Sequence, residues 1–90
     1  MAKLYRIYTE DVNREEIERL AALQFDSFSI SNAVGYWTGS RECSLVVEVF
    51  EPVAFYHAQQ KVGKLAQAIK QANKQEAVLV IELDCEGVLI

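Results

Sequence analysis

Hydrophobic and polar residues alternate with period two over most of residues 25–51, around a centre of small residues. This pattern is typical of β-strands whose two faces meet different surroundings. Gly39-Ser40 lies inside the segment, and a Gly-X pair suits a two-residue type II′ turn. We therefore expect a long β-hairpin in which this pair forms the turn and Trp37 faces Glu42.

The alternation divides the hairpin into two faces. The first carries large apolar residues and is expected to pack against helices: Phe28, Ile30, Val34, Tyr36, Cys43, Leu45, Val47 and Val49. The second mixes small residues with a few large apolar ones: Ser29, Ser31, Ala33, Gly35, Trp37, Glu42, Ser44, Val46, Glu48 and Phe50. The second face is either a plain solvent face or an interface with another subunit. We favour an interface made by Ala33, Trp37, Ser44, Val46 and Phe50.

Two further segments precede and follow the hairpin. Residues 3–9 are rich in aromatic and β-branched types and predict a first strand. Asn13, followed three residues later by Glu16, predicts a helix N-cap with a capping box, and apolar residues at helical spacing extend that helix over about 13–24. A buried strand is predicted for the apolar run 75–83, with both of its faces covered.

A second amphipathic helix is predicted after Pro52, because apolar residues recur there at spacings of three and four. Gly63 lowers helix stability by roughly 1 kcal/mol relative to alanine. We therefore expect regular helix only after Gly63, and residues 52–60 stay open between helix and loop.

The order strand, helix, strand, strand, helix, strand predicts an α+β fold of the ferredoxin-like βαββαβ type. Its sheet is expected to be antiparallel with two helices on one face, and Cys85–Ile90 forms an extra C-terminal strand or a tail. Ninety residues suffice for one domain, 1–90, because a second core would need roughly 50 more. Domains of this size bury little surface, which favours a homo-oligomer.

Charge and segment composition restrict the partners. A net charge of -4 argues against general nucleic-acid binding, which needs a basic surface. The N-terminal residues lack the apolar core of a signal peptide, and no run approaches the ~20 apolar residues of a membrane span, so we expect a cytoplasmic protein with no membrane partner. Cys43 and Cys85 have no His or Asp at ligand spacing, so neither a zinc site nor a disulfide framework is indicated. We expect no bound metal and no cofactor.

No residue is assigned a catalytic role. His57 is the only histidine, and it has no nucleophile or ligand-pair motif beside it. The carboxylates Glu42, Glu48 and Glu51 are candidates for a general base or a metal ligand, although a solvated strand edge is the more common explanation of such a group. A small hydrolase that uses His57 or these carboxylates is one alternative function.

Trp37 and Tyr36 are the strongest candidates for ligand binding, because an aromatic ring at a hairpin tip can stack on a base. Arg41 and Glu42 would add polar contacts there. Arg6 and Tyr8 of the first strand would contribute if the ligand lies between subunits.

The second helix is basic, with Lys61, Lys64, Lys70 and Lys74 and no acid between Pro52 and Gln75. Such a helix can attract phosphate-bearing ligands, although these lysines do not form one patch and a solvated helix is the favoured explanation. Lys61 and Lys64 flank one side of its apolar stripe, and the other two lysines flank the opposite side. We include Lys61 and Lys64 among the candidate ligand-binding residues.

The hairpin residues Trp37, Gly39, Glu42 and Ser44, with Gln75-Glu76-Ala77-Val78-Leu79, resemble a small uncharacterised bacterial and phage family. Its members share a Trp-Gly-Glu-x-Ser hairpin and a Gln-Glu-Ser-Val strand, and the resemblance covers about 25–90. The turn is shorter in this chain, and the secretion signal common in that family is not expected here. More loosely, it is similar to the PII and CutA group, which implies a ferredoxin-like trimer with ligands between subunits. The PII phosphate-binding loop has no counterpart here.

These observations together favour a non-enzymatic homo-oligomer that binds a small anionic or nucleotide-like molecule at a subunit interface. One version is a viral or bacterial protein that sequesters a nucleotide signal. The alternatives are the hydrolase and a structural or adaptor subunit with no ligand.

Overall fold

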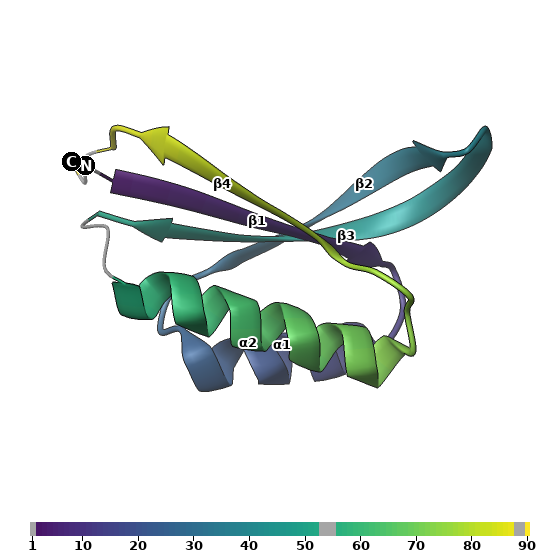
Figure 1. The fold of residues 1–90 in the computed structure, drawn as a ribbon, viewed down its shortest axis with the longest axis horizontal. Helices are drawn as coiled ribbons and strands as arrows, with labels where there is room; N and C mark the ends of the chain where they lie inside the picture. The colour runs from purple at the N-terminus through teal and green to yellow at the C-terminus, as the bar shows by residue number, and fades with distance from the viewer. Residues whose placement is uncertain (1, 53–55, 88–89) are drawn as a thin grey trace.

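The computed structural model describes residues 2–52, 56–87 and 90. Its elements follow the predicted order: β1 (Ala2–Glu10), α1 (Arg14–Gln24), β2 (Ser29–Trp37), β3 (Ser40–Glu51), α2 (Tyr56–Asn73) and β4 (Leu79–Cys85). All strand pairs are antiparallel, and the sheet order is β2-β3-β1-β4. Both helices cover one face of this sheet (Figure 1). The predicted ferredoxin-like fold is therefore confirmed.

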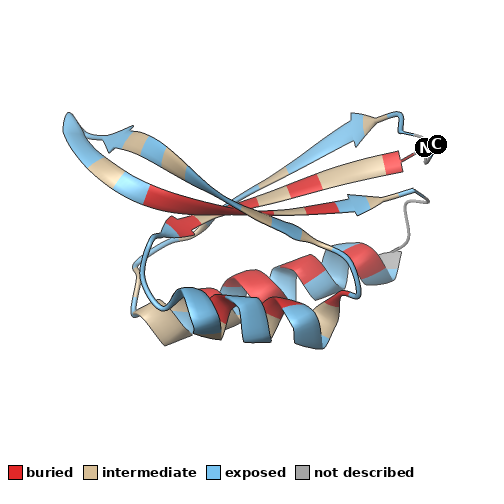
Figure 2. Cartoon of the chain, turned by 180° about the vertical axis from the view of Figure 1, so that it is seen from behind, coloured by how far each residue is buried: buried red, intermediate tan, exposed pale blue. Residues whose placement is uncertain are grey.

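The core lies between the sheet and the helices, where the buried residues gather (Figure 2). The sheet contributes one set of alternating residues, and each helix contributes one stripe. Its fully buried members include Ile7, Leu45 and Val47 from the strands, and Ile17, Leu65 and Ile69 from the helices. The opposite face of the sheet has no helix over it, and we call it the outer face.

The hairpin turn differs from the prediction by one residue. Its central residues are Thr38 and Gly39, with φ of 48° and 85°, so Trp37 pairs with Ser40 and not with Glu42. A type I′ turn needs positive φ at both central positions and matches the twist of the flanking strands. Threonine rarely adopts this conformation, so the sequence suggested the wrong turn. The pairing shifts by two residues, and the two faces keep their predicted members.

The face predicted to pack against the helices is only partly buried. Val34, Tyr36 and Cys43 lie on it but are exposed, because the turn end of the hairpin extends beyond both helices (Figure 1).

The second helix is longer than predicted. It begins at Tyr56 and continues through Gly63, which lies on its exposed side. Buried Val62 and Leu65 flank the glycine and hold the helix against the sheet, and burying two such side chains outweighs a propensity cost of about 1 kcal/mol. Residues 53–55 of the predicted region 52–60 lie outside the described residues.

Asn13 precedes the first helix as predicted, but its side chain does not cap it. Its φ is 54°, and the helix has no side-chain cap. Asn13 Nδ2 instead donates a hydrogen bond to Asn73 Oδ1 at 3.1 Å, which links the start of α1 to the end of α2. The predicted capping box with Glu16 is therefore wrong, because Glu16 pairs with Arg19.

The last strand is not buried on both faces. β4 pairs only with β1 and forms an edge of the sheet, with Leu79 45% and Leu83 40% exposed. Its apolar run led to the prediction, since such runs are typical of central strands. Glu86 and Gly87 are not in a strand, and residues 88–89 of the possible extra strand lie outside the described residues.

Candidate ligand-binding cleft

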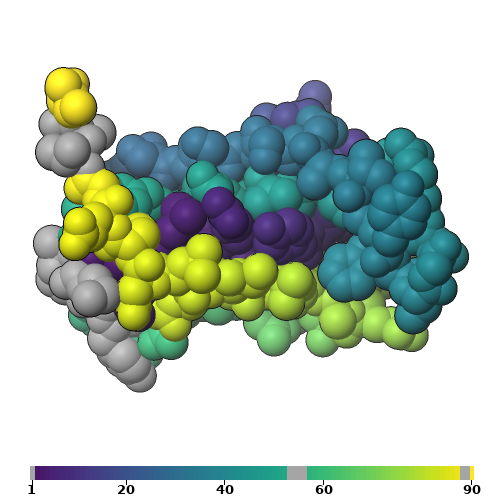
Figure 3. Space-filling model, turned by 90° about the horizontal axis from the view of Figure 1, so that it is seen from above, coloured from purple at the N-terminus to yellow at the C-terminus, as the bar shows by residue number. Residues whose placement is uncertain are grey.

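A cleft opens where the β2-β3 hairpin extends beyond β1. The last residue of β1, Glu10, pairs with Ser44, so the β3 residues nearer the turn have no β1 partner. The cleft is about 680 Å³ in volume, which is within the range of small-molecule sites. It is lined by the hairpin, the end of β1 and the α2-β4 connection: Tyr8, Thr9, Glu10, Trp37, Glu42, Ser44, Lys74, Gln75, Glu76, Ala77, Val78 and Leu79. Figure 3 shows the outer face, with the end of the hairpin at the right.

Trp37 lies on the outer face of the hairpin, above Gly35 of the same strand. A Cβ atom at Gly35 would lie 3.0 Å from Nε1 of the indole and 3.6 Å from Oγ of Ser44. The missing side chain thus provides the space in which the ring lies against the sheet. Trp37 is 47% exposed, so the rest of its surface is available for stacking.

A hydrogen-bond network fixes the wall of the cleft opposite the hairpin. Thr9, only 3% exposed, donates its hydroxyl hydrogen to Oε1 of Gln75. Nδ2 of Asn73 donates to the Thr9 hydroxyl and to the same Gln75 oxygen, each at 3.2 Å. Nε2 of Gln75 donates to the carbonyl oxygen of Ala77 at 3.4 Å. These bonds hold the α2-β4 connection against the end of β1.

Three carboxylates and one ammonium line the cleft: those of Glu10, Glu42, Glu76 and Lys74. None of the four forms an ion pair with the residues that the structure describes. Ser44 is 5% exposed, and its hydroxyl makes no hydrogen bond within the described part of the chain. The cleft therefore offers polar groups whose bonding capacity is unused.

Only some of the predicted ligand-binding residues lie together. The cleft brings Tyr8, Trp37 and Glu42 to one place, with Ser44 from the predicted interface. Tyr36 and Arg41 pair with each other on the other face of the hairpin, so they do not line the cleft.

The remaining predicted residues are basic and lie elsewhere. Arg6 is on the outer face but donates from Nε to Oε2 of Glu48 at 2.8 Å, and this hydrogen bond raises the pKa of the guanidinium. Lys61 and Lys64 are exposed on α2. Lys61 lines a smaller hollow with Glu51 and His57.

Sequence reasoning missed the contribution of the α2-β4 connection. Lys74, Gln75 and Glu76 form a wall of the cleft, although they are far from Trp37 in the sequence. The motif Gln75-Glu76-Ala77-Val78-Leu79 was the available signal, but it was interpreted only as the start of a strand. The strand begins at Leu79, so the motif is mainly a loop beside the hairpin.

The outer face carries two apolar rows that cross the sheet. Val46, Tyr8 and Leu79 face one another in one row, and Phe50, Leu4 and Leu83 form the other. Of the predicted interface residues, Val46 and Ser44 are buried, with exposed fractions of 8% and 5%. Ala33 is partly exposed, and Phe50 is 39% exposed. The first row leads directly to the cleft, because Tyr8 and Leu79 also line it.

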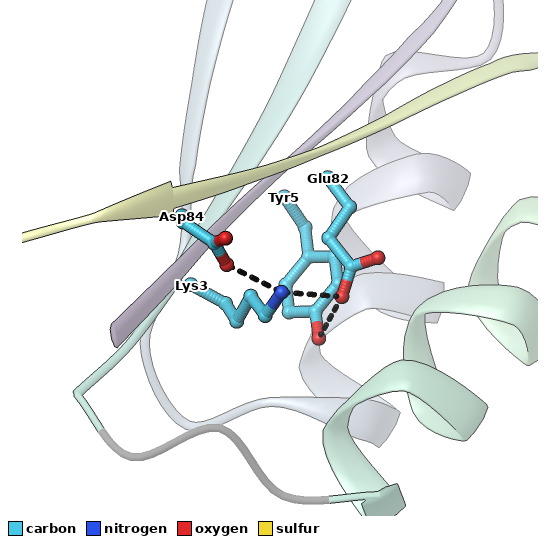
Figure 4. A network of polar contacts seen from close by, with 4 residues as sticks. All are labelled: Lys3, Tyr5, Glu82 and Asp84. Atoms are coloured by element: carbon cyan, nitrogen blue, oxygen red, sulfur yellow. Dashed lines mark hydrogen bonds and ion pairs between the residues drawn. The ribbon is translucent and has the colours of Figure 1, made fainter. Parts of the chain in front are cut away.

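A second polar cluster lies on the helix side of β1 and β4 (Figure 4). Lys3 Nζ lies 2.5 Å from Asp84 Oδ1 and 3.5 Å from Glu82 Oε1, and the Tyr5 hydroxyl donates to the same Glu82 oxygen at 3.3 Å. The hydrogen bond to Asp84 raises the pKa of Lys3. Burial of the Tyr5 side chain raises the pKa of its hydroxyl group, and the neighbouring Glu82 carboxylate raises it further. This cluster ties the edge strand to the centre of the sheet.

Of the residues of the hydrolase alternative, only His57 and Glu51 lie together, in the smaller hollow beside Lys61. His57 lies at the start of α2 and the cleft at its end, roughly 25 Å away at 1.5 Å per residue. Glu48 pairs with Arg6, whereas Glu42 lies in the cleft. Among the described residues, no group of three His, Cys, Asp or Glu side chains is placed to hold a metal ion. No helix in the described ranges has the length and hydropathy of a membrane span.

Solved structures share this architecture. A phage SAM lyase in complex with S-methyl-5′-thioadenosine is similar with a TM-score of 0.74 and 15% identity, over 92% of this chain and 81% of that one. A DUF3240 family protein from Shewanella baltica gives 0.69 and 17%, over 99% and 97%. A nitrogen regulatory PII-like protein from Thiomonas intermedia, bound to ADP, AMP and bicarbonate, gives 0.65 and 16%, over 99% and 96%. A CutA protein also matches.

The comparisons establish the fold class. No protein-family model and no curated protein sequence matches this chain. At these identities the structural likeness concerns the backbone, and it supports the similarity to the PII and CutA group that the sequence suggested. Several of these neighbours hold small ligands. The fold and the cleft together define a ferredoxin-like domain with an open pocket at the end of its sheet.

Proposed function

We propose that this chain is a homo-oligomeric protein that binds an adenosine-containing small molecule in the cleft, between subunits, without changing it chemically. The observation that carries the proposal is the position of Trp37 above Gly35, where its exposed ring faces an open cleft of about 680 Å³. An aromatic surface of this kind suits a planar base, and base stacking on it contributes about 1–3 kcal/mol. Tyr8 provides a second ring in the same cleft.

The ligands of similar structures support the adenosine part of the proposal. S-methyl-5′-thioadenosine, ADP and AMP all contain an adenosine group. The unused hydrogen-bonding groups of Ser44 and Glu42 are suited to ribose hydroxyls or to the edge of a base.

The outer face supports the oligomeric part. Its apolar rows leave Phe50, Leu79 and Leu83 exposed at 39–45% on a surface that no helix covers. The Arg6–Glu48 ion pair separates the two rows on β1 and β3, and Ile81 connects them along β4. Exposed apolar surface of this kind marks protein interfaces. The row that ends at Leu79 also reaches the cleft, so a second copy on this face would close the open side of the cleft.

Native mass spectrometry with added adenosine, S-methyl-5′-thioadenosine, AMP and ADP tests the proposal. The expected result is an assembly whose mass is a multiple of 10.2 kDa and which carries a nucleoside adduct. Denaturing the complex should release the ligand unchanged. A 10.2 kDa monomer at micromolar concentration would contradict the oligomer. An assembly without any adduct would favour the adaptor alternative, and a released ligand of altered mass would favour an enzyme.

A further inference from the structure

The charge of the cleft indicates which adenosine compound it accepts. We propose that the cleft selects nucleosides without phosphate groups, either uncharged or positively charged, and discriminates against nucleotides. This inference rests on the function proposed above. This selectivity departs from the anionic ligand that the sequence suggested, which relied on the lysines of the second helix, since only Lys74 of these lines the cleft.

The first argument is the excess of carboxylates. Glu10, Glu42 and Glu76 line the cleft with Lys74 as the only basic side chain in the described lining. Glu42 is only partly exposed and lies on the outer face of the hairpin with Trp37. Since none of the three carboxylates is ion-paired within the described ranges, their charge acts on the cleft itself.

The second argument is the orientation of α2. This helix ends at Asn73, and the residues directly after it, Lys74–Ala77, line the cleft. Of the last four carbonyl groups of α2, those of Lys70 and Gln71 accept hydrogen bonds from the N–H groups of Gln75 and Lys74, so the partial negative charge of the helix C-terminus remains on the other two. That end therefore adds to the negative potential of the carboxylates, which disfavours a phosphate group in the cleft.

Trp37 makes this potential measurable without a ligand, because it is the only tryptophan of the chain. Iodide and caesium quench indole fluorescence and carry opposite charges. Relative to N-acetyltryptophanamide, iodide should quench Trp37 about twofold less than caesium, and the difference should shrink in high salt. Glu42→Gln should raise quenching by iodide. Glu15→Gln on α1 makes the same change in net charge away from the cleft and should leave quenching unchanged.

Calorimetric titration then compares ligands of different charge. Adenosine and S-methyl-5′-thioadenosine should bind at least tenfold more tightly than AMP, and S-adenosylmethionine, which carries a sulfonium, should bind at least as tightly as adenosine. AMP binding equal to or tighter than adenosine, or equal quenching by the two ions, would overturn the selectivity. If quenching shows the negative potential but no adenosine compound binds, the proposed function is contradicted and the charge of the cleft stands.

Discussion

The indole of Trp37 lies against Gly35 so closely that a Cβ atom at Gly35 would be 3.0 Å from Nε1. Gly35→Ala should therefore displace the ring, because the neighbouring atoms must move by a few tenths of an ångström. We expect a shift in the Trp37 emission maximum and about tenfold weaker nucleoside binding, which corresponds to the lower part of the stacking range. Emission spectra and calorimetry measure both effects. Unchanged emission and affinity would show that the ring does not depend on this space.

Gly63, unlike Gly35, has open space where a side chain would lie. It lies on the exposed side of α2, and nothing lies within 4 Å of a Cβ atom at this position. Gly63→Ala should stabilise the protein by about 1 kcal/mol and raise the Tm by about 4–8 °C, without affecting the cleft. Gly39→Ala should instead destabilise it by about 1–2 kcal/mol, because Gly39 has a φ of 85°. Thermal unfolding measures both, and a destabilising Gly63→Ala would contradict the packing of α2.

The hydrogen bonds of Thr9 should be important for stability, because its hydroxyl lies between Asn73 and Gln75 and is buried. Thr9→Val removes the hydroxyl but keeps the shape of the side chain, and it should lower the free energy of unfolding by about 1–3 kcal/mol. The matched variant Thr9→Ser keeps the hydroxyl and loses one methyl group, at a cost of about 1 kcal/mol. Urea unfolding distinguishes them. A Thr9→Val protein more stable than Thr9→Ser would refute the network.

Stability should fall in alkaline solution because of Lys3 and Tyr5. The hydrogen bond to Asp84 raises the pKa of Lys3, and burial raises the pKa of Tyr5. The folded state then holds more protons than the unfolded state once the pH exceeds the unfolded pKa values of roughly 10. The stability that Lys3 and Tyr5 contribute in this way is fully present below that pH, and it is lost as the pH rises through their pKa values in the folded state.

Chemical unfolding from pH 8 to pH 11.5 checks this dependence. The free energy of unfolding should decline from about pH 10 upward. The double variant Lys3→Met with Tyr5→Phe should show a smaller decline, whatever its stability at pH 8. An identical slope in both proteins would mean that the cluster in Figure 4 does not contribute.

The outer face should carry the assembly. Leu83 is 40% exposed beside Leu4 in one of the apolar rows, whereas Leu23 is 67% exposed on α1. Leu83→Asp should convert the proposed oligomer into a 10.2 kDa monomer at micromolar concentration, because a carboxylate on an apolar interface is costly to bury. Leu23→Asp introduces the same residue elsewhere and should leave the assembly intact. Sedimentation equilibrium measures the masses, and dissociation of both variants or of neither would contradict the interface.

The sequence was most informative where a period repeats over many residues. Period two along the hairpin placed Leu45 and Val47 in the core correctly, even though the turn was wrong, because a two-residue shift keeps each side chain on its face. The exposed β4 was mistaken for a central strand because an apolar run does not reveal which strand lies at the edge.

The cleft was harder to predict than the fold. Trp37, Tyr8 and Glu42 were recognised as candidates from residue type and face, and the structure places them around one cavity. Lys61 and Lys64 were grouped with them only by charge, and they lie on a helix away from it. The wall formed by Gln75 and its neighbours depends on side-chain hydrogen bonds between distant segments, which no local pattern encodes.

Calorimetric titration of adenosine into the wild-type protein, Trp37→Ala and Tyr36→Ala tests the central claim most directly. Tyr36 is the matched control, since it is a neighbouring aromatic residue, 69% exposed, on the opposite face of β2. We predict binding to the wild type, a loss of about 5- to 150-fold in affinity for Trp37→Ala, and no change for Tyr36→Ala. No binding to the wild type, or an equal loss in both variants, would contradict a nucleoside site at the cleft.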